Sequence, residues 1–139
     1  MADVHEPAVR SYNMSRIRGK DTKPELIVRR FLFSKGFRYR LHAKDLPGRP
    51  DIVLPKWKTV IFVHGCFWHG HSGCKYFVVP QTRREWWLNK ISGNKRRDSK
   101  NVTVMKSMGL RVLSIFECEL KPTRREGTLT RTLKLLRTT

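Results

Sequence analysis

The segment from Val63 to Cys74 constrains what this chain can fold into more than any other part of the sequence. It packs two Cys, three His, a Phe-Trp pair and three Gly into twelve residues. Three of its side chains have the C-x4-H-x2-C spacing of metal ligands: Cys66, His71 and Cys74. Two further imidazoles, His64 and His69, remain for other chemistry. A metal ion held here would fasten the loop to whichever distant segment supplies another ligand.

Two short apolar strands lead into this loop. Residues 51–54 and 59–63 are β-prone runs separated by four residues, so we predict an antiparallel hairpin. Pairing the last residue of the first run with the first residue of the second places Asp51 opposite Phe62. The isolated acid therefore lies beside the end of the second strand, where His64 emerges.

A third strand is predicted over residues 111–116, and Cys118 follows it almost at once. Residues 82–91 and 95–108 are predicted to be helices that form a crossover, so the third strand can run parallel to the second hairpin strand. The ends of neighbouring parallel strands lie side by side, which would bring Cys118 to Cys66. This element order indicates a mixed α/β sheet with flanking helices.

Residues 22–25 predict the start of a helix, with Thr22 as the cap, Pro24 in the first turn and Glu25 at the capping-box position. A broad apolar face that includes Phe33 follows, and Gly36 ends the helix. The other predicted elements are a strand over 37–41 and a helix over 123–136.

The length of 139 residues suits one domain with a real core and is too short for two. We expect residues 22–139 to form a single domain. Residues 1–21 are polar and basic, and we expect them to form an N-terminal arm with a short helix over 8–18.

Structural zinc explains the cysteines better than three unrelated buried thiols do. Three is an odd count in a chain whose N-terminus lacks the apolar region of a signal peptide, which argues against a disulfide framework. The predicted sheet independently brings Cys118 to the loop, and a Cys3His set is typical of four-coordinate zinc. The spacing alone allows either His69 or His71 as the imidazole ligand.

The net charge of +19, from 30 Lys and Arg against 11 Asp and Glu, indicates a polyphosphate partner. The alternative is a basic surface that only keeps the protein in solution. We expect nucleic acid rather than a membrane, because the chain has no long apolar segment. We also expect a cytoplasmic protein associated with the nucleoid through DNA.

Three side chains should converge at one end of the hairpin: Asp51, His64 and His69. A carboxylate suits Mg2+ bound jointly with a substrate phosphate, and two imidazoles can move protons to and from oxygen. Each has an ordinary alternative as a turn acid, a strand-end imidazole or a spare ligand, but their convergence favours an active site. Glu25 is either a capping-box carboxylate or a group that reaches the metal through water.

The sequence resembles the very-short-patch repair (Vsr) endonucleases over nearly its whole length, thinning after about residue 120. The blocks that carry the resemblance are residues 1–5, 13–14, 46–51, 60–69, 109–113 and 117–118. The most specific of these are Pro-Gly-Arg-Pro-Asp, which ends at Asp51, and His-Gly-Cys-Phe-Trp-His, which ends at His69.

The resemblance implies a bacterial DNA repair enzyme with a restriction-endonuclease-like fold. Such an enzyme nicks double-stranded DNA just 5′ of the T in T·G mismatches that arise when 5-methylcytosine deaminates. It implies catalytic Mg2+ held by Asp51 and the backbone carbonyl of Val63, with catalysis by His64 and His69. It also assigns four side chains to structural Zn2+: Cys66, His71, Cys74 and Cys118.

The resemblance further implies that aromatic side chains wedge into the DNA beside the mismatch: Phe67, Trp68 and Trp87. Met14 would insert from the opposite groove, and Lys90 and Asn94 would lie near the recognised bases. Core packing is the alternative for the aromatic residues, and we prefer it for Trp86. We expect a monomer that is functionally coupled to a cytosine-5 DNA methyltransferase and to downstream repair proteins.

Two other functions compete with mismatch-directed nicking. One is a restriction- or homing-type metal-dependent endonuclease that cuts intact duplex DNA. The other is a zinc-stabilised DNA-binding module without activity, which would leave Asp51, His64 and His69 without a task.

Overall fold

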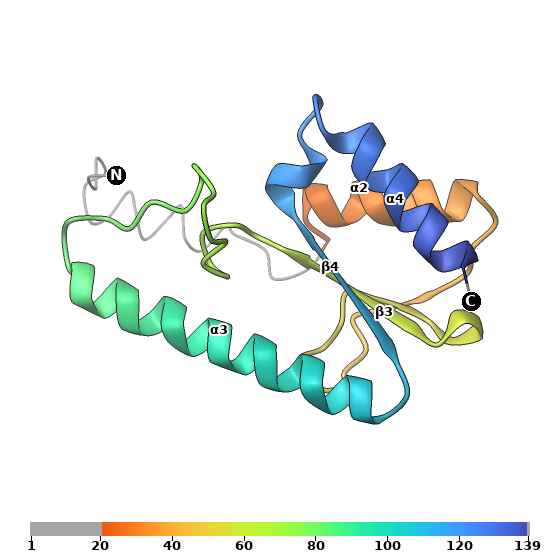
Figure 1. Cartoon of the computed structure of the whole chain (residues 1–139), viewed down its shortest axis with the longest axis horizontal. Helices are drawn as coiled ribbons and strands as arrows, with labels where there is room; N and C mark the ends of the chain where they lie inside the picture. Colours follow the sequence, from red (N-terminus) through yellow and green to blue (C-terminus); the bar gives the residue numbers. More distant parts are fainter. Residues whose placement is uncertain (1–20, 139) are drawn as a thin grey trace.

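The computed structural model describes residues 21–138, which form one four-stranded sheet with helices on both of its faces (Figure 1). The strands lie in the order of the chain: β1 (Arg40–Leu41), β2 (Ile52–Leu54), β3 (Thr59–His64) and β4 (Arg111–Phe116). The β1–β2 and β2–β3 pairs are antiparallel, and β3 and β4 are parallel. The predicted mixed α/β sheet is therefore confirmed.

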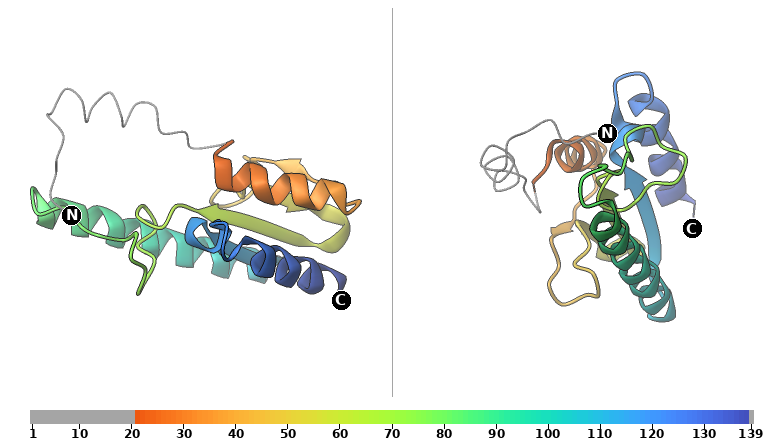
Figure 2. Two further views of the ribbon diagram at one scale, coloured as in Figure 1. Left: turned by 90° about the horizontal axis from the view of Figure 1, so that it is seen from above. Right: turned by 90° about the vertical axis from the view of Figure 1, so that its left-hand side faces the viewer.

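Three α-helices and two short 3-10 turns complete the described fold: α2 (Lys23–Ser34), η1 (Pro55–Trp57), α3 (Arg84–Ser107), η2 (Glu117–Leu120) and α4 (Arg125–Arg137). Helices α2 and α4 cover one face of the sheet, and α3 lies along the other (Figures 1 and 2). None of the helices in this part of the chain combines the length and the apolar character that a membrane crossing requires.

Alternation along the strands builds the two core layers, because successive side chains of a strand point to opposite faces of the sheet. Towards α2 and α4 the strands direct Ile52, Leu54, Ile61 and Ile115, which pack with Val28, Leu32 and Leu136. Towards α3 they direct Val53, Val60 and Phe62, which pack with Met105. Both faces of the sheet are therefore buried, as the nearly continuous apolar runs of the strands require.

The predicted strand register is confirmed. Leu54 pairs with Thr59, and Asp51 directly precedes β2. In this register Asp51 lies level with Phe62. Strand β4 pairs with β3 from Arg111 to Phe116, and the last pair joins Phe116 to His64. Both strands end at the same level, and the segments that follow them meet there.

Helix α3 differs from the two predicted helices, because it runs unbroken through residues 92–94. A glycine inside a helix costs only about 1 kcal/mol relative to alanine. Packing on both sides of Gly93 offsets this cost, since Ile91 is 2% exposed and Met105 is fully buried. The helix continues where local sequence indicated a break.

Other element boundaries were also wrong. The strand predicted over 37–41 is reduced to Arg40–Leu41, because Phe37 packs its ring against Trp57 at 4.6 Å instead of extending the sheet. The last helix begins and ends slightly later than predicted, at Arg125 and Arg137. In α2, Phe33 is 55% exposed and does not belong to the buried face.

Gly70 is where the loop after β3 packs against α3. Its φ is +57°, and a Cβ atom there would lie 2.6 Å from the Cγ2 of Ile91 and 2.9 Å from the Cδ of Lys95. Gly73, in the same loop, has a φ of +71° but no atom within 4 Å of such a Cβ.

Gly70→Ala should lower the free energy of unfolding by about 1–3 kcal/mol more than Gly73→Ala, because only Gly70 faces a buried neighbour that must shift. Urea unfolding followed by tryptophan fluorescence measures both variants. Equal losses would mean that backbone conformation alone sets the cost and that contact with α3 contributes nothing.

Candidate functional site

A pocket of about 490 Å³ opens at the end of β3, beside the N-terminus of α2. Its walls come from four separate parts of the chain, and five of its ten residues have ionisable side chains. The residues that line it are Thr22, Pro24, Glu25, Asp51, Val63, His64, Gly65, Trp68, His69 and Glu117.

Asp51 reaches this pocket from the start of β2. Its Oδ2 accepts a hydrogen bond of 2.7 Å from the backbone N–H of Val63, which ties the carboxylate to the end of β3. Burial raises the pKa of Asp51 to about 6, although the Val63 N–H and the charges of His42 and His69 oppose the shift. A cation bound nearby would lower the pKa of this buried carboxyl group, because a positive charge favours the ionised form.

His64 and His69 lie together, with ring centroids 4.0 Å apart. His64 is 8% exposed and stacks against Phe62 at 5.5 Å. Burial, followed by the charge of His69, lowers the pKa of His64 to about 4. His64 is therefore neutral near pH 7 and can accept a proton.

Asp98 on α3 is a partner of His69 that the sequence reasoning missed. The Nδ1 of His69 and the Oδ2 of Asp98 are 2.6 Å apart, and both side chains are about 30% exposed. This contact orients the imidazole. The available signal was an isolated acid within the basic run 95–100.

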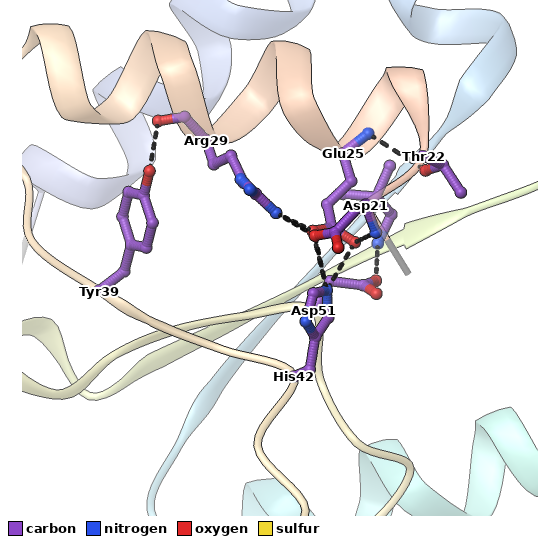
Figure 3. A network of polar contacts seen from close by, with 8 residues as sticks. Asp21, Thr22, Glu25, Arg29, Tyr39, His42 and Asp51 are labelled. Atoms are coloured by element: carbon purple, nitrogen blue, oxygen red, sulfur yellow. Dashed lines mark hydrogen bonds and ion pairs between the residues drawn. The ribbon is translucent and has the colours of Figure 1, made fainter. Parts of the chain in front are cut away.

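Glu25 is only 1% exposed, although it lies in the first turn of a helix. As predicted, Thr22 caps the helix by accepting from the N–H of Glu25, at 3.4 Å. The carboxylate of Glu25 accepts from the N–H of Asp21 at 3.2 Å and also meets Arg29 and His42 (Figure 3). It therefore does more than cap the helix.

The four predicted zinc ligands come together behind the pocket. Their ligand atoms all lie within 4.8 Å of one another: Cys66, His71, Cys74 and Cys118. The structure places His71, rather than His69, beside the thiols. All three cysteines are free of disulfides.

Local contacts prepare this cluster for a cation. The backbone N–H of Cys118 donates to the sulfur of Cys66 at 3.4 Å, and the His71 ring stacks on Phe116 at 3.9 Å. Burial raises the pKa of Cys66 to about 12, and a bound cation would favour the thiolate form of this sulfur. Glu117, which lines the pocket, accepts from the N–H of Cys66 at 3.3 Å and so joins the cluster to the pocket.

Phe67, Trp68 and Trp87 contact one another through their rings, at centroid distances of 5.2 to 5.8 Å. Trp68 also lines the pocket. Trp86 packs edge-on against Trp87 but is 45% exposed, so our assignment of Trp86 to the core was wrong.

Of the remaining predicted DNA contacts, Lys90 is exposed on α3 and Met14 lies outside the described residues. Asn94 is occupied within the chain. Its Nδ2 donates to the backbone carbonyl of Trp68 at 2.8 Å, and its Oδ1 accepts from Arg97.

Comparison with known proteins identifies the family. Residues 2–75 match the family model described as DNA mismatch endonuclease Vsr. The chain is 50% identical over 121 residues to the Type II nicking enzyme V.NmeAIP of Neisseria meningitidis serogroup A, covering 87% of this chain and 86% of that protein. It is 46% identical over 121 residues to the DNA mismatch endonuclease Vsr of Escherichia coli K12, covering 87% of this chain and 77% of that protein. The chain therefore belongs to the Vsr family of DNA mismatch endonucleases.

Proposed function

We propose that this Vsr-family endonuclease nicks double-stranded DNA on the 5′ side of the T in T·G mismatches left by deamination of 5-methylcytosine. The observation that carries the proposal is the convergence of Asp51, His64 and His69 on one pocket in a strongly basic protein. Carboxylate and imidazole groups that meet in one pocket suit metal-assisted hydrolysis of a phosphodiester.

The donor set of the pocket fits Mg2+, a hard cation that prefers oxygen ligands. We assign the carboxylate of Asp51 and the backbone carbonyl of Val63 as its protein ligands, with Glu25 acting through water. When bound, Mg2+ supplies a Lewis acid for the scissile phosphate and orients water beside it.

The two imidazoles have different surroundings, and we assign them different tasks. Neutral His64 accepts the proton of the attacking water, whose oxygen forms the new bond to phosphorus. We assign to His69, which Asp98 orients, the delivery of a proton to the leaving sugar oxygen as its bond to phosphorus breaks. The products are one hydroxyl end and one phosphate end at the nick.

We assign Zn2+ to the Cys3His cluster, where it closes the loop between the ends of β3 and β4. The ion has a structural task in this proposal, because all four protein ligands are supplied and no position remains for substrate. The cluster keeps His69 and Trp68, which lie in the same loop, at the pocket.

The aromatic cluster gives the proposal a means of recognising mismatches. Unstacking a base step costs a few kcal/mol, and a mismatched step should open more readily than a paired one. We propose that Phe67, Trp68 and Trp87 wedge into the opened step, with Met14 entering from the opposite groove. Lys90 and Asn94 then contact the bases, and Asn94 must exchange its present bonds to do so.

The wider assignments stay proposals of the same kind. We propose a restriction-endonuclease-like fold with a single catalytic domain at 22–139 and a DNA-contacting arm at 1–21. We propose that the protein acts as a cytoplasmic monomer, coupled to a cytosine-5 DNA methyltransferase and downstream repair proteins.

One assay separates this function from its competitors. The protein is incubated with Mg2+ and matched duplexes with and without a central T·G pair. Nicking of only the T·G duplex supports the proposal, and equal cleavage of both indicates an endonuclease for intact DNA. Binding without cleavage of either duplex would indicate a binding module.

Asp51→Asn should abolish nicking while DNA binding survives. Asparagine keeps an acceptor for the Val63 N–H but lacks the charge that a metal ion needs, whereas binding draws on distributed Lys and Arg. Single-turnover nicking and gel-shift affinity measure the two effects. Asp45→Asn, at an exposed ion pair with Arg40, is the matched control and should retain activity. Nicking by Asp51→Asn at the control rate would remove Asp51 from the site.

Cys118→Ser should lower zinc content well below one equivalent per chain and destabilise the fold by several kcal/mol, because metal binding is also folding energy. Atomic absorption and thermal melting measure these changes. Ser72→Ala, at an exposed position in the same loop, serves as the control. Full zinc content with unchanged melting would contradict the Cys3His assignment.

Trp68→Ala and Phe67→Ala should reduce the preference for T·G over paired duplex by about tenfold, since one base–aromatic stack is worth roughly 1–3 kcal/mol. Binding to paired DNA should change less, because phosphate contacts do not depend on the mismatch. Affinities for both duplexes at one salt concentration test this, with the exposed Phe33→Ala as control. An equal loss on both duplexes would refute the wedge.

A further inference from the structure

We propose that His42 is a positioning residue of the pocket, which fixes the carboxylate of Glu25 and the main chain at Asp51 in one arrangement, with Arg29 as a second clamp on Glu25. The proposal rests on the proposed function. It concerns two side chains that lie outside the pocket wall and touch groups that form it.

His42 holds the pocket at two points. Its Nε2 lies 2.9 Å from Oε1 and 2.8 Å from Oε2 of Glu25. Its backbone N–H donates to the carbonyl of Asp51 at 3.0 Å. One residue therefore connects the first turn of α2 to the start of β2, and Figure 3 shows His42 beside both acids.

Arg29 clamps Glu25 from the other side. Its Nη1 is 2.7 Å from Oε2 of Glu25 and 2.7 Å from Oδ1 of Asp21. The hydroxyl of Tyr39 donates to the backbone carbonyl of Arg29 at 3.0 Å, on the same face of α2 (Figure 3). Glu25 thus has bonded partners at both oxygens, which leaves its nearly buried carboxylate little rotational freedom.

The backbone conformation of two of the residues around Glu25 suits their residue types. His42 has a φ of +47° and Asp21 a φ of +56°, a region that side-chain-bearing residues rarely adopt. Asp and His adopt this region several-fold more often than other side-chain-bearing residues, so both positions suit their residue types. Both residues use this conformation while bonded to Glu25.

The same groups do not form a convincing metal site of their own. The ligand atoms of Asp21, Glu25 and His42 lie within 4.8 Å of one another, which is compatible with an ion. However, the guanidinium of Arg29 already supplies the positive charge between the two carboxylates. We therefore assign Glu25 the role of a fixed carboxylate that accepts a hydrogen bond from water beside Asp51.

The geometry also fixes a tautomer. A carboxylate offers only acceptors when ionised, so the Nε2 of His42 must carry a proton to bond to Glu25. This state can be observed without measuring activity.

The test uses His42→Ala, His42→Gln, Arg29→Met and, as matched control, Arg30→Met at an exposed position on the same helix. Each variant is assayed for nicking of a T·G duplex at saturating Mg2+, for DNA affinity and for thermal melting. His42→Ala and Arg29→Met should slow nicking by about 10- to 100-fold, as expected for groups that orient a metal site, with DNA affinity unchanged. His42→Gln, whose amide can donate to Glu25, should recover most of the rate, and Arg30→Met should match wild type.

Spectra of the protein labelled with 15N-histidine supply the second readout. They should show one imidazole, absent from His42→Gln, that is protonated at Nε2 at neutral pH. An unprotonated Nε2 would overturn the proposal, as would wild-type nicking by both His42→Ala and Arg29→Met. If His42→Ala unfolds, the comparison of Arg29→Met with Arg30→Met decides in the same way.

The failure of this proposal can be told from the failure of the proposed function. Wild-type protein that does not nick the T·G duplex overturns both. Nicking by the wild-type protein with equally slow His42→Ala and His42→Gln overturns the donor role of His42, and with it this proposal, while the proposed function stands. Loss of melting temperature with an unchanged rate per folded molecule shows a purely structural role and overturns the positioning role.

Discussion

The parallel pairing of β3 with β4 is the constraint on which the rest of the structure depends. Six residue pairs join the strands, and the last joins His64 to Phe116. Because the strands run in the same direction, the segments that follow them start at the same level. One segment carries His69 and the loop cysteines, and the other carries Glu117 and Cys118. The pocket and the Cys3His cluster therefore lie next to each other, and the hydrogen bond from Cys66 to Glu117 connects them.

The distribution of charge fits the same arrangement. The chain has only 11 acidic residues against 30 Lys and Arg. Five of those acids line the pocket or contact a residue that lines it: Asp21, Glu25, Asp51, Asp98 and Glu117. A surface rich in cations attracts a polyanion, while a local group of carboxylates attracts a cation. The few negative charges are thus concentrated at the pocket, where they would offset the repulsion of a metal ion by the surrounding positive charges.

Sequence reasoning succeeded where chemistry and strand geometry constrain each other. The hairpin register followed from two apolar runs and a short turn, and it placed Asp51 correctly. The meeting of Cys118 with Cys66 followed from the parallel crossover. The uninterrupted α3 was missed because the anchors Ile91 and Met105 act through tertiary contacts that local propensity does not contain.

The supporting residues of the site were harder to predict. Asp98 reaches His69 across 29 positions of the chain, and His42 reaches Glu25 across 17. Neither pair has a characteristic spacing in the sequence. Each joins a helix to a loop, and such contacts follow from tertiary packing rather than from the periodicity of a helix or strand. The backbone conformation of His42 is likewise invisible in its residue type.

Because α3 is unbroken, it sets the distance between the residues proposed to contact bases and the residue that supports the catalytic His69. Lys90, Asn94 and Asp98 are four residues apart, so they form one row on the helix, separated by about 6 Å per step. In the proposed complex, Lys90 and Asn94 contact the bases, while Asp98 orients His69. The helix thus fixes the distance between the contacted base pair and the phosphate that is hydrolysed. An inserted or deleted residue between 90 and 98 would rotate one end of this row by about 100° relative to the other, since each residue advances the helix by that angle.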